Sequence, residues 1–593
     1  MAHDIHDCGP WNPGISSEMP AELRPWVTLL RPENSRTPVA SAVELQKLTA
    51  LPLGELVALR PERLLLHELL VRVTADFSVP DGSRIEDLGI NFREIIRLLL
   101  ARYLAPHQEK LIAAFEHDRS ELTRLIQTAF DEVTATGTRP CQTQGRPSRL
   151  SQLFHLPKDV PPPPSASTWG LDQIATCERK AAHESQPLHA VAYRSLARVM
   201  SALFAVHGQP WGTRELMVSL ATDLACNTHG SEALGQMIEP LLQQAAREQG
   251  YSLLPPQPYP VIINTKGPSA SGKSTLRPLQ KRLAGAIGVP WSDFALISPD
   301  IWRKQLLDYA SLGKDYKYAG ALTSDELQII DQKLDRYMAL KQRRGAMSHL
   351  LIDRFRFDSF AGDSAEAGSN LLTRFGHSVY LFFMITPPEL LVERAWKRGL
   401  AVGRYKAVDD TLAHSVEAYA GMPNVFFTWI HRSDKRIHFE FLDNSVRFGD
   451  LPRTVAFGSN DTIHVLDVSR LLDIERFGRV DIEARSPGSL YRDRGCLEPQ
   501  HNLRFLKQCI SGFREVIFAD QASGRIYLRM AGGRPVLVDR QLLSRMAQAP
   551  DTRVSFEAIA PDALNGSVDA SKEPQYLPRS RADSPTIGEW GGV

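Results

Sequence analysis

Nine consecutive residues near the middle of the chain have the types and spacing of a phosphate-binding loop. They follow the pattern G-x-x-x-x-G-K-[ST] and are Gly267, Pro268, Ser269, Ala270, Ser271, Gly272, Lys273, Ser274 and Thr275. Glycines let the backbone curl so that successive N–H groups point at a polyphosphate, and the following helix adds the positive end of its dipole. In such loops the lysine reaches the β- and γ-phosphates and the serine hydroxyl binds Mg²⁺. The pattern therefore predicts a site for ATP or GTP with Mg²⁺.

Asp300 comes directly after the second strand that we expect in this region. Ligands of open parallel sheets bind beyond the carboxyl ends of the strands, which is where this side chain would lie. A carboxylate there could accept the proton of an acceptor hydroxyl while the γ-phosphoryl group moves in line. The alternative is that Asp300 caps the helix expected over residues 301–309.

Asp353 ends the third expected strand, after three aliphatic residues at 350–352. A run of aliphatic residues followed by an acid is typical of the strand whose aspartate binds the Mg²⁺ shell of a P-loop enzyme. Asp353 could equally hold the acceptor substrate, or be a surface acid at a strand end.

A basic segment follows the fourth expected strand. Residues 393–398 have a helical pattern, and residues 399–403 predict a glycine-containing break. Arginines on a hinged segment can close over a transferring phosphoryl group and stabilise its charge. The alternative is a solvated basic helix face. The basic residues are Arg394, Lys397, Arg398, Arg404 and Lys406.

The elements that must position these residues alternate between strand and helix. A short apolar strand precedes the loop, and residues 276–286 after it have a helical pattern. This alternation implies a parallel sheet with helices on both faces. The expected strands are 261–264, 294–298, 349–352, 379–385 and 437–442, with 462–468 at an edge.

At 593 residues the chain is too long for a single core, and we expect a multidomain protein. Helical periodicity marks the N-terminal region, and a hairpin pattern over 516–530 marks a small β-rich C-terminal unit. The expected divisions are a disordered leader (1–40), a helical domain (41–135), a Pro-rich linker (136–170), a second helical domain (171–250), an α/β P-loop kinase core (255–485), a β-rich domain (486–568) and a disordered tail (569–593).

Composition excludes several classes of partner. The formal net charge of +1 gives no support for nucleic-acid binding, and the longest apolar runs are too short to cross a bilayer. The six cysteines lack metal-site spacing and fit free thiols in a reducing compartment. No apolar signal segment is visible at the N-terminus, so we expect a cytoplasmic protein.

With these residues assembled, the region from about 262 to 444 resembles the zeta-toxin group of P-loop kinases, over about a third of the chain. Ala270 stands where the family's loop has its second glycine. The other matched positions are Asp300 after the second strand with Arg303 soon after, Asp353 after the third, and Arg394, Arg398 and Gly403-Arg404 for the family's R…R…G-R lid.

The resemblance implies transfer of a γ-phosphoryl group from ATP or GTP to a hydroxyl of a small molecule, with Asp300 as base and Asp300, Arg303 and Asp353 at the substrate. The family's typical acceptor is a UDP-activated amino sugar, while relatives phosphorylate other nucleotides, so a nucleotide or nucleotide sugar is the expected class. A role as bacterial toxin or effector follows from the same resemblance. The chain departs from the family in its large flanking regions, and in having aspartate at 353 where many relatives have glutamate.

Two other functions remain open at this stage. The core could be a nucleotide-gated ATPase or switch whose flanking regions bind a protein partner or act as an inhibitor. It could also be a scaffold with a degenerate core, although the complete loop argues against that. No second phosphate-binding loop and no N-K-x-D sequence support a motor ATPase or a GTPase.

Overall fold

The computed structural model describes residues 8–135, 166–208, 212–353, 372–447, 449–566, 573–578 and 585–591. These residues divide into two compact units. One comprises 21–70 and 97–247, and the other 1–20, 71–96 and 248–593. The first seven residues, most of the predicted linker (136–165) and parts of the predicted tail lie outside the described residues.

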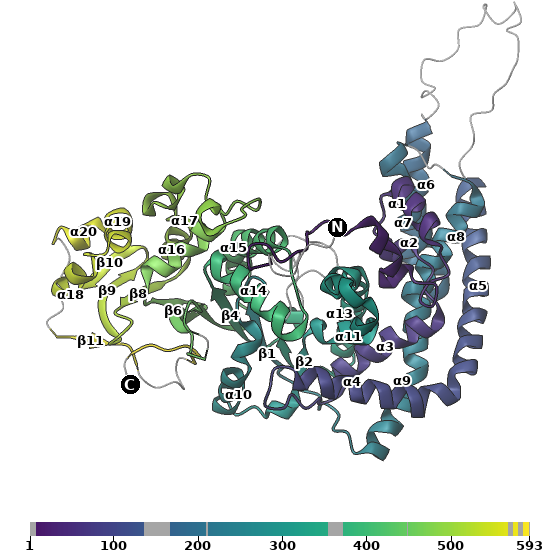
Figure 1. The fold of residues 1–593 in the computed structure, drawn as a ribbon, viewed down its shortest axis with the longest axis horizontal. Helices are drawn as coiled ribbons and strands as arrows, with labels where there is room; N and C mark the ends of the chain where they lie inside the picture. The colour runs from purple at the N-terminus through teal and green to yellow at the C-terminus, as the bar shows by residue number, and fades with distance from the viewer. Residues whose placement is uncertain are drawn as a thin grey trace, which may run out of the picture. The chain divides into compact units, whose positions relative to one another are not determined.

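The first unit is built from helices whose apolar residues recur every three or four positions. In α5 this spacing buries Leu111, Phe115, Leu122 and Ile126, and α5 packs against α7 and α8. The two helical domains expected over 41–135 and 171–250 therefore share one unit, except that residues 71–96 belong to the second unit. The helices are α1 (Val39–Thr49), α2 (Leu53–Leu56), the start of α3 (Pro61–Asp76), α5 (Gln108–Ala135), α6 (Ala166–His183), α7 (Pro187–His207), α8 (Arg214–Ala225) and α9 (Ser231–Gln249) (Figure 1).

The described part of the predicted leader is folded. Two 3₁₀ helices, η2 (Ala21–Trp26) and η3 (Thr28–Leu30), belong to the helical unit, and Leu29 is fully buried. Residues 8–20 belong to the second unit instead. The leader differs from the expectation because its few apolar side chains are buried among those of distant segments, which a local composition does not reveal.

One mixed sheet organises the second unit. Its strand order is β10-β9-β8-β7-β6-β5-β4-β1-β3-β2, with β11 beside β9. The five adjacent strands β2, β3, β1, β4 and β5 are mutually parallel. The strands are β1 (Val261–Lys266), β2 (Phe294–Ile297), β3 (His349–Ile352), β4 (Ser378–Ile385), β5 (Arg436–Asp443), β6 (Arg453–Ser459), β7 (Thr462–Val465), β8 (Glu515–Ala519), β9 (Arg525–Ala531), β10 (Arg534–Val538) and β11 (Gln575–Tyr576).

Alternation along β4 buries both faces of the parallel part. Phe382 packs in a cluster with Leu279 and Leu283 of α10, whereas its neighbour Phe383 contacts the ring of Phe426 on α15. The helices of this unit are α4 (Asp87–Leu99), α10 (Arg277–Ala286), α11 (Arg303–Leu306), α12 (Ala319–Leu322), α13 (Ser324–Arg343), α14 (Pro388–Val402), α15 (Val408–Ile430), α16 (Val468–Phe477), α17 (Arg504–Gly512), α18 (Arg540–Met546), α19 (Pro550–Ile559) and α20 (Pro561–Leu564).

The expected β-rich C-terminal unit is not a separate sheet. The predicted hairpin of β8 and β9 is present, but β8 pairs in parallel with β7, so the C-terminal strands extend the same sheet. Strand β6 completes this continuation by pairing antiparallel with β5 and β7. The boundary expected near residue 486 is therefore crossed by backbone hydrogen bonds.

Part of the predicted tail completes the buried part of the sheet. Glu440 on β5 is fully buried, and its carboxylate accepts hydrogen bonds from the backbone N–H groups of Ile587 (2.7 Å) and Gly588 (3.0 Å). Thr454 of β6 donates to the same carboxylate (2.7 Å). An isolated buried carboxylate is costly, so residues 585–591 are held in place by the pairing they provide.

Candidate functional site

The loop after β1 depends on two glycines. A Cβ added at Gly267 would lie 2.7 Å from Cβ of Met384, and one at Gly272 would lie 2.3 Å from Nδ2 of Asn444. Gly272 also has φ +94°, which side chains other than hydrogen disfavour. The loop backbone thus runs against the carboxyl ends of β4 and β5 with no room for larger residues.

Ala270 occupies the left-handed region with φ +65°. A residue with a Cβ pays about 1–2 kcal/mol for that conformation, which glycine adopts without strain.

Side chains from two other strand ends hold the loop. Asn444, just after β5, donates from Nδ2 to the carbonyl of Ser271 (2.7 Å). The hydroxyl of Thr386, just after β4, lies 3.5 Å from the same carbonyl. The loop shape is thus fixed before any ligand binds.

The side chain of Lys273 folds back onto the start of the loop to which it belongs. Its Nζ donates to the carbonyls of Gly267 (3.0 Å) and Pro268 (2.9 Å). Burial lowers the pKa of this lysine to about 8, although the carboxylates of Asp353 and Asp300 oppose that effect. Lys273 is a cation close to both candidate carboxylates.

Ser274 and Asp353, the two residues predicted to bind metal, meet directly. The Ser274 hydroxyl donates to Oδ2 of Asp353 (2.8 Å), because β1 and β3 are parallel neighbours and both residues follow their carboxyl ends. Within the described part of the chain no group of three or more His, Cys, Asp or Glu side chains forms a metal site. A hydroxyl and one carboxylate suit Mg²⁺, which keeps several waters and takes few protein ligands.

Asp300 lies in a 3₁₀ helix, η10 (Pro299–Trp302), and its carboxylate bonds two arginines. Arg303 Nε donates to Oδ1 (3.0 Å) and Arg404 Nη2 to Oδ2 (2.5 Å). The helix-cap alternative is wrong, since Ser298 is the capping residue and the carboxylate faces side chains. Burial would raise the pKa of Asp300, but Arg404, Arg303 and Arg398 outweigh it and hold that pKa far below its usual range.

The three predicted lid arginines do not all face Asp300. Arg404 does, and Arg398 lies beside it, with Nε 3.4 Å from the Arg404 carbonyl and its pKa lowered to about 10 by burial and by Arg404. Arg394 instead donates to the carbonyls of Asn444 (2.8 Å) and Val446 (3.3 Å). Arg394 therefore supports the turn after β5 in this structure.

The predicted break over 399–403 is shorter than expected. Helix α14 continues through Gly399 to Val402 and ends at Gly403, which has φ +73°. Position 399 requires glycine because the ring of Tyr405 packs against it, and a Cβ there would lie 2.4 Å from Cδ1 of that ring.

Sequence reasoning missed His414. This residue of α15 contacts Nζ of Lys406 through its Nδ1. A single histidine within a mainly apolar helix gives no spacing signal, so only the fold could pair it with Lys406.

Residues 8–20 contact Lys317 and the helices α14 and α15. The Pro13 carbonyl accepts from Lys317 Nζ (3.0 Å), and Ser17 donates to Asp409 at the start of α15 (2.6 Å). Trp11 packs on a cluster that includes Val392 of α14 and Leu412 of α15. The N-terminal segment is thus attached to the two helices that flank the Arg404 turn.

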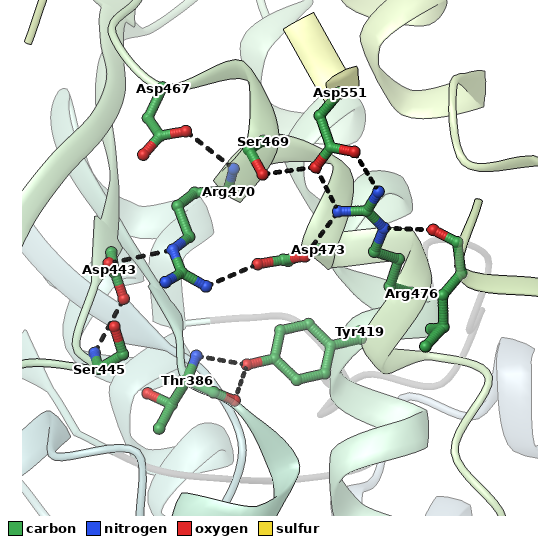
Figure 2. Close-up of polar contacts among 11 residues, drawn as sticks. Thr386, Tyr419, Asp443, Ser445, Asp467, Ser469, Arg470, Asp473, Arg476 and Asp551 are labelled. Carbon is green, nitrogen blue, oxygen red and sulfur yellow. Dashed lines mark hydrogen bonds and ion pairs between the residues drawn. The ribbon is translucent and has the colours of Figure 1, made fainter. Parts of the chain in front are cut away.

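A second arginine–aspartate group lies beyond the end of β5 (Figure 2). Arg470 of α16 bonds Asp473 (2.9 Å) and pairs with Asp443 (3.3 Å). Arg476 bonds both oxygens of Asp551 (2.8 Å each). We call this set, completed by Asp467 at the start of α16, the α16 network; it joins the sheet to α16 and α19.

No protein-family model matches this chain, and no curated protein matches its sequence. Among the described helices none has the length and apolar character needed to cross a membrane. The argument for function therefore depends on the geometry of the site.

Proposed function

We propose that the sheet unit contains a P-loop kinase core, which transfers the γ-phosphoryl group of ATP or GTP to a hydroxyl of a small molecule. Strand order supports this proposal. After β1 the chain turns towards β2, and after β4 it turns towards β5 on the other side, so the adjacent ends of β1 and β4 form a topological switch point. Ligands of open α/β sheets bind at such points.

The nucleotide and its metal fit the residues present. The loop is closely packed, since a Cβ at Gly267 or Gly272 would overlap Met384 or Asn444. A glycine-containing loop of this kind presents backbone N–H groups to phosphates. Ser274 Oγ and Asp353 Oδ2 lie 2.8 Å apart, and these two residues would hold Mg²⁺. Bound there, Mg²⁺ would neutralise charge on the β- and γ-phosphate oxygens.

The observation that carries the kinase proposal is the state of Asp300. Its side chain is 46% exposed, yet two arginines keep it ionised, and it lies in the field of Lys273. A carboxylate that is anchored by arginines and about half exposed can accept a hydrogen bond from the hydroxyl of an acceptor that enters from solvent.

The chain's own residues then have separate roles. Asp300 accepts a hydrogen bond from the acceptor hydroxyl and orients it. The hydroxyl oxygen forms a bond to the γ-phosphorus while the bond to the β–γ bridging oxygen breaks. Because its pKa is low, Asp300 takes the proton late and passes it to solvent, which suits a loose transition state. Lys273, Arg398 and Arg404 stabilise the transferring charge.

The test is mass spectrometry of a metabolite extract incubated with the protein, Mg²⁺ and γ-¹⁸O-labelled ATP. We expect a labelled phosphometabolite, with a nucleotide or nucleotide sugar as the first acceptor class to examine. Asp300→Asn should keep nucleotide binding and lose the product. Asp308→Asn is the matched control, because Asp308 is exposed and caps the neighbouring helix, a role that asparagine also fills.

Two results would contradict the proposal. Labelled inorganic phosphate with no labelled metabolite would favour a nucleotide-gated ATPase with a protein partner. Wild-type product formation by Asp300→Asn would remove the role given to that carboxylate.

A further inference from the structure

Residues 404–407 connect α14 to α15 and belong to neither helix. Arg404 bonds Asp300, and Lys406, two residues on, is electrostatically coupled to Asp300, Arg398 and Lys273. Arg404 and Lys406 therefore face the same group of charges.

Tyr405, between them, anchors the segment. Its ring makes edge contacts with Tyr316 (5.7 Å between centroids) and Trp396 (5.5 Å). Lys317 Nζ lies 5.0 Å from the ring centre, and Gly399 allows the ring to lie against α14. The direction of Lys406 is consequently fixed by packing as well as by its own contacts.

The contact that Lys406 makes through Nζ is unusual for a lysine. Its partner atom is Nδ1 of His414, an imidazole that burial and the charge of Lys406 keep neutral by lowering its pKa to about 2. A neutral imidazole nitrogen accepts a hydrogen bond from an ammonium group without neutralising its charge.

The charges facing Lys406 come from four elements. Asp410 lies in α15, which begins at Val408; Arg398 comes from α14, Lys273 from the loop and Asp300 from η10. Asp300 is already bonded by Arg303 and Arg404. Among the described residues of the site the cations Lys273, Arg303, Arg398, Arg404 and Lys406 outnumber the carboxylates Asp300, Asp353 and Asp410.

We propose that Lys406 is a further phosphate-binding residue of this site, and that it takes up a proton when a phosphoryl group binds beside it. The proposal rests on the function proposed above for the identity of the ligand, but the charge arrangement applies to any phosphate. An excess of cations with a neutral hydrogen-bond acceptor suits an anionic ligand.

Proton uptake follows from the burial of Lys406. Burial lowers the pKa of Lys406 to about 7, so about half of these side chains are neutral at pH 7. A phosphate dianion favours the ammonium form and raises the pKa, so binding draws in a proton. Affinity should then fall as pH rises, by roughly tenfold between pH 7 and 8.5.

The experiment is calorimetry of the full chain at pH 8 in two buffers of different ionisation enthalpy. The probes are a non-hydrolysable ATP analogue with Mg²⁺ and, separately, inorganic pyrophosphate. Lys273 also titrates near this pH, so the measured quantity is the difference between variants. Lys406→Met is neutral at every pH and Lys406→Arg is charged at every pH. Lys397→Met, an exposed position on α14, is the control.

We expect wild type and Lys397→Met to take up about 0.5–1 proton more than either Lys406 variant, with Lys406→Arg retaining tighter binding than Lys406→Met. Thermal melting establishes that each variant is folded. Two different replacements of Lys406 are used, so that the test does not depend on a single variant. Equal uptake by wild type and both Lys406 variants would overturn the proposal while leaving the kinase proposal intact.

The two probes separate the two proposals. If pyrophosphate binds with uptake that depends on Lys406 and the ATP analogue does not bind, the phosphate subsite stands and the proposed nucleotide function fails. If neither probe binds, both fail.

Discussion

Two groups of arginines and aspartates lie in the same unit, and they manage an excess of charge in opposite ways. Around Asp300 the described cations outnumber the carboxylates, and Asp300 itself is 46% exposed. In the α16 network Arg470 and Arg476 pair with three carboxylates, those of Asp443, Asp473 and Asp551, while Asp467 accepts from the backbone N–H of Arg470 (Figure 2). The side chain of Asp473 is 9% exposed.

The pKa directions express this difference. In the α16 network the carboxylates outnumber the arginines, and burial raises the pKa values of Asp467 and Asp473. In the Asp300 group the surplus is positive, the carboxylate stays ionised, and an external anion can relieve it. A cluster with an excess of cations is thus a candidate site for an anionic ligand, whereas the carboxylate-rich α16 network joins elements of the fold.

The largest effect should come from removing a site cation. We expect Lys273→Ala to lower phosphoryl transfer about 10³-fold, because the transferring charge loses a preorganised partner. Its melting temperature should stay close to wild type, because removing Lys273 also removes the cost of burying its charge. Single-turnover kinetics and thermal melting measure the two quantities. A large loss of stability with retained turnover would contradict the binding role that the comparison gives to the cations around Asp300.

Removing a cation from the α16 network should do the reverse. Arg476→Met leaves Asp551 and Asp473 without their shared partner, and we expect a loss of about 3 kcal/mol or more in the free energy of unfolding. Urea denaturation measures it. Arg492→Met is the control, because Arg492 is 77% exposed in its pair with Asp481 and should change stability by less than about 0.5 kcal/mol. Equal losses for both variants would contradict the prediction.

A smaller effect is expected from Arg404→Met, with a shift in pH dependence. Transfer should fall about 10²-fold, and the pKa of Asp300 should rise because one of its two bonded cations is lost. Wild-type Asp300 stays ionised down to strongly acidic pH. In the variant Asp300 should become protonated at a higher pH, and the remaining activity should be lost there. Rate profiles from pH 4 to 7 measure this limb. Arg432→Met, in an exposed pair with Asp434, should leave the profile unchanged.

The smallest effect concerns backbone strain in the loop. Ala270→Gly removes the strain of a left-handed conformation, which costs the folded state about 1–2 kcal/mol. Glycine also raises the entropy of the unfolded chain, which lowers stability by about 0.4–1 kcal/mol. We therefore expect the free energy of unfolding to rise by about 0.5 kcal/mol. Ala50→Gly, at φ +53° after α1, is the matched change in the helical unit. Urea denaturation of both compares them. A gain at Ala50 with a loss at Ala270 would show that the methyl group of Ala270 has a packing role in the loop.

Much of the parallel sheet was predictable because its strands are short apolar runs with loop residues at both ends. The strands from β1 to β5 lie within one or two residues of the expected positions. The meeting of Ser274 with Asp353 follows from their places after parallel strands. Such pairings need only strand order and direction, which alternating strand and helix patterns supply.

What the sequence did not reveal depends on contacts between distant segments. Strand β6 begins and ends with polar residues, and its apolar centre of three or four residues is too short to stand out. Its position beside β5, and the parallel pairing of β7 with β8, join segments with no shared local pattern. The partner of Lys406 and the place of Arg394 likewise depended on how α14 and α15 pack.

The buried carboxylate of Glu440 has a consequence for the order in which the chain can fold during synthesis. Two of its hydrogen-bond donors are backbone N–H groups at residues 587 and 588, nearly 150 positions later than Glu440 itself. Until the ribosome has made those residues, β5 carries a carboxylate that must stay hydrated or protonated. The helical unit can fold early in translation, whereas the sheet that bears the phosphate loop reaches its final packing only after residues 587 and 588 have emerged.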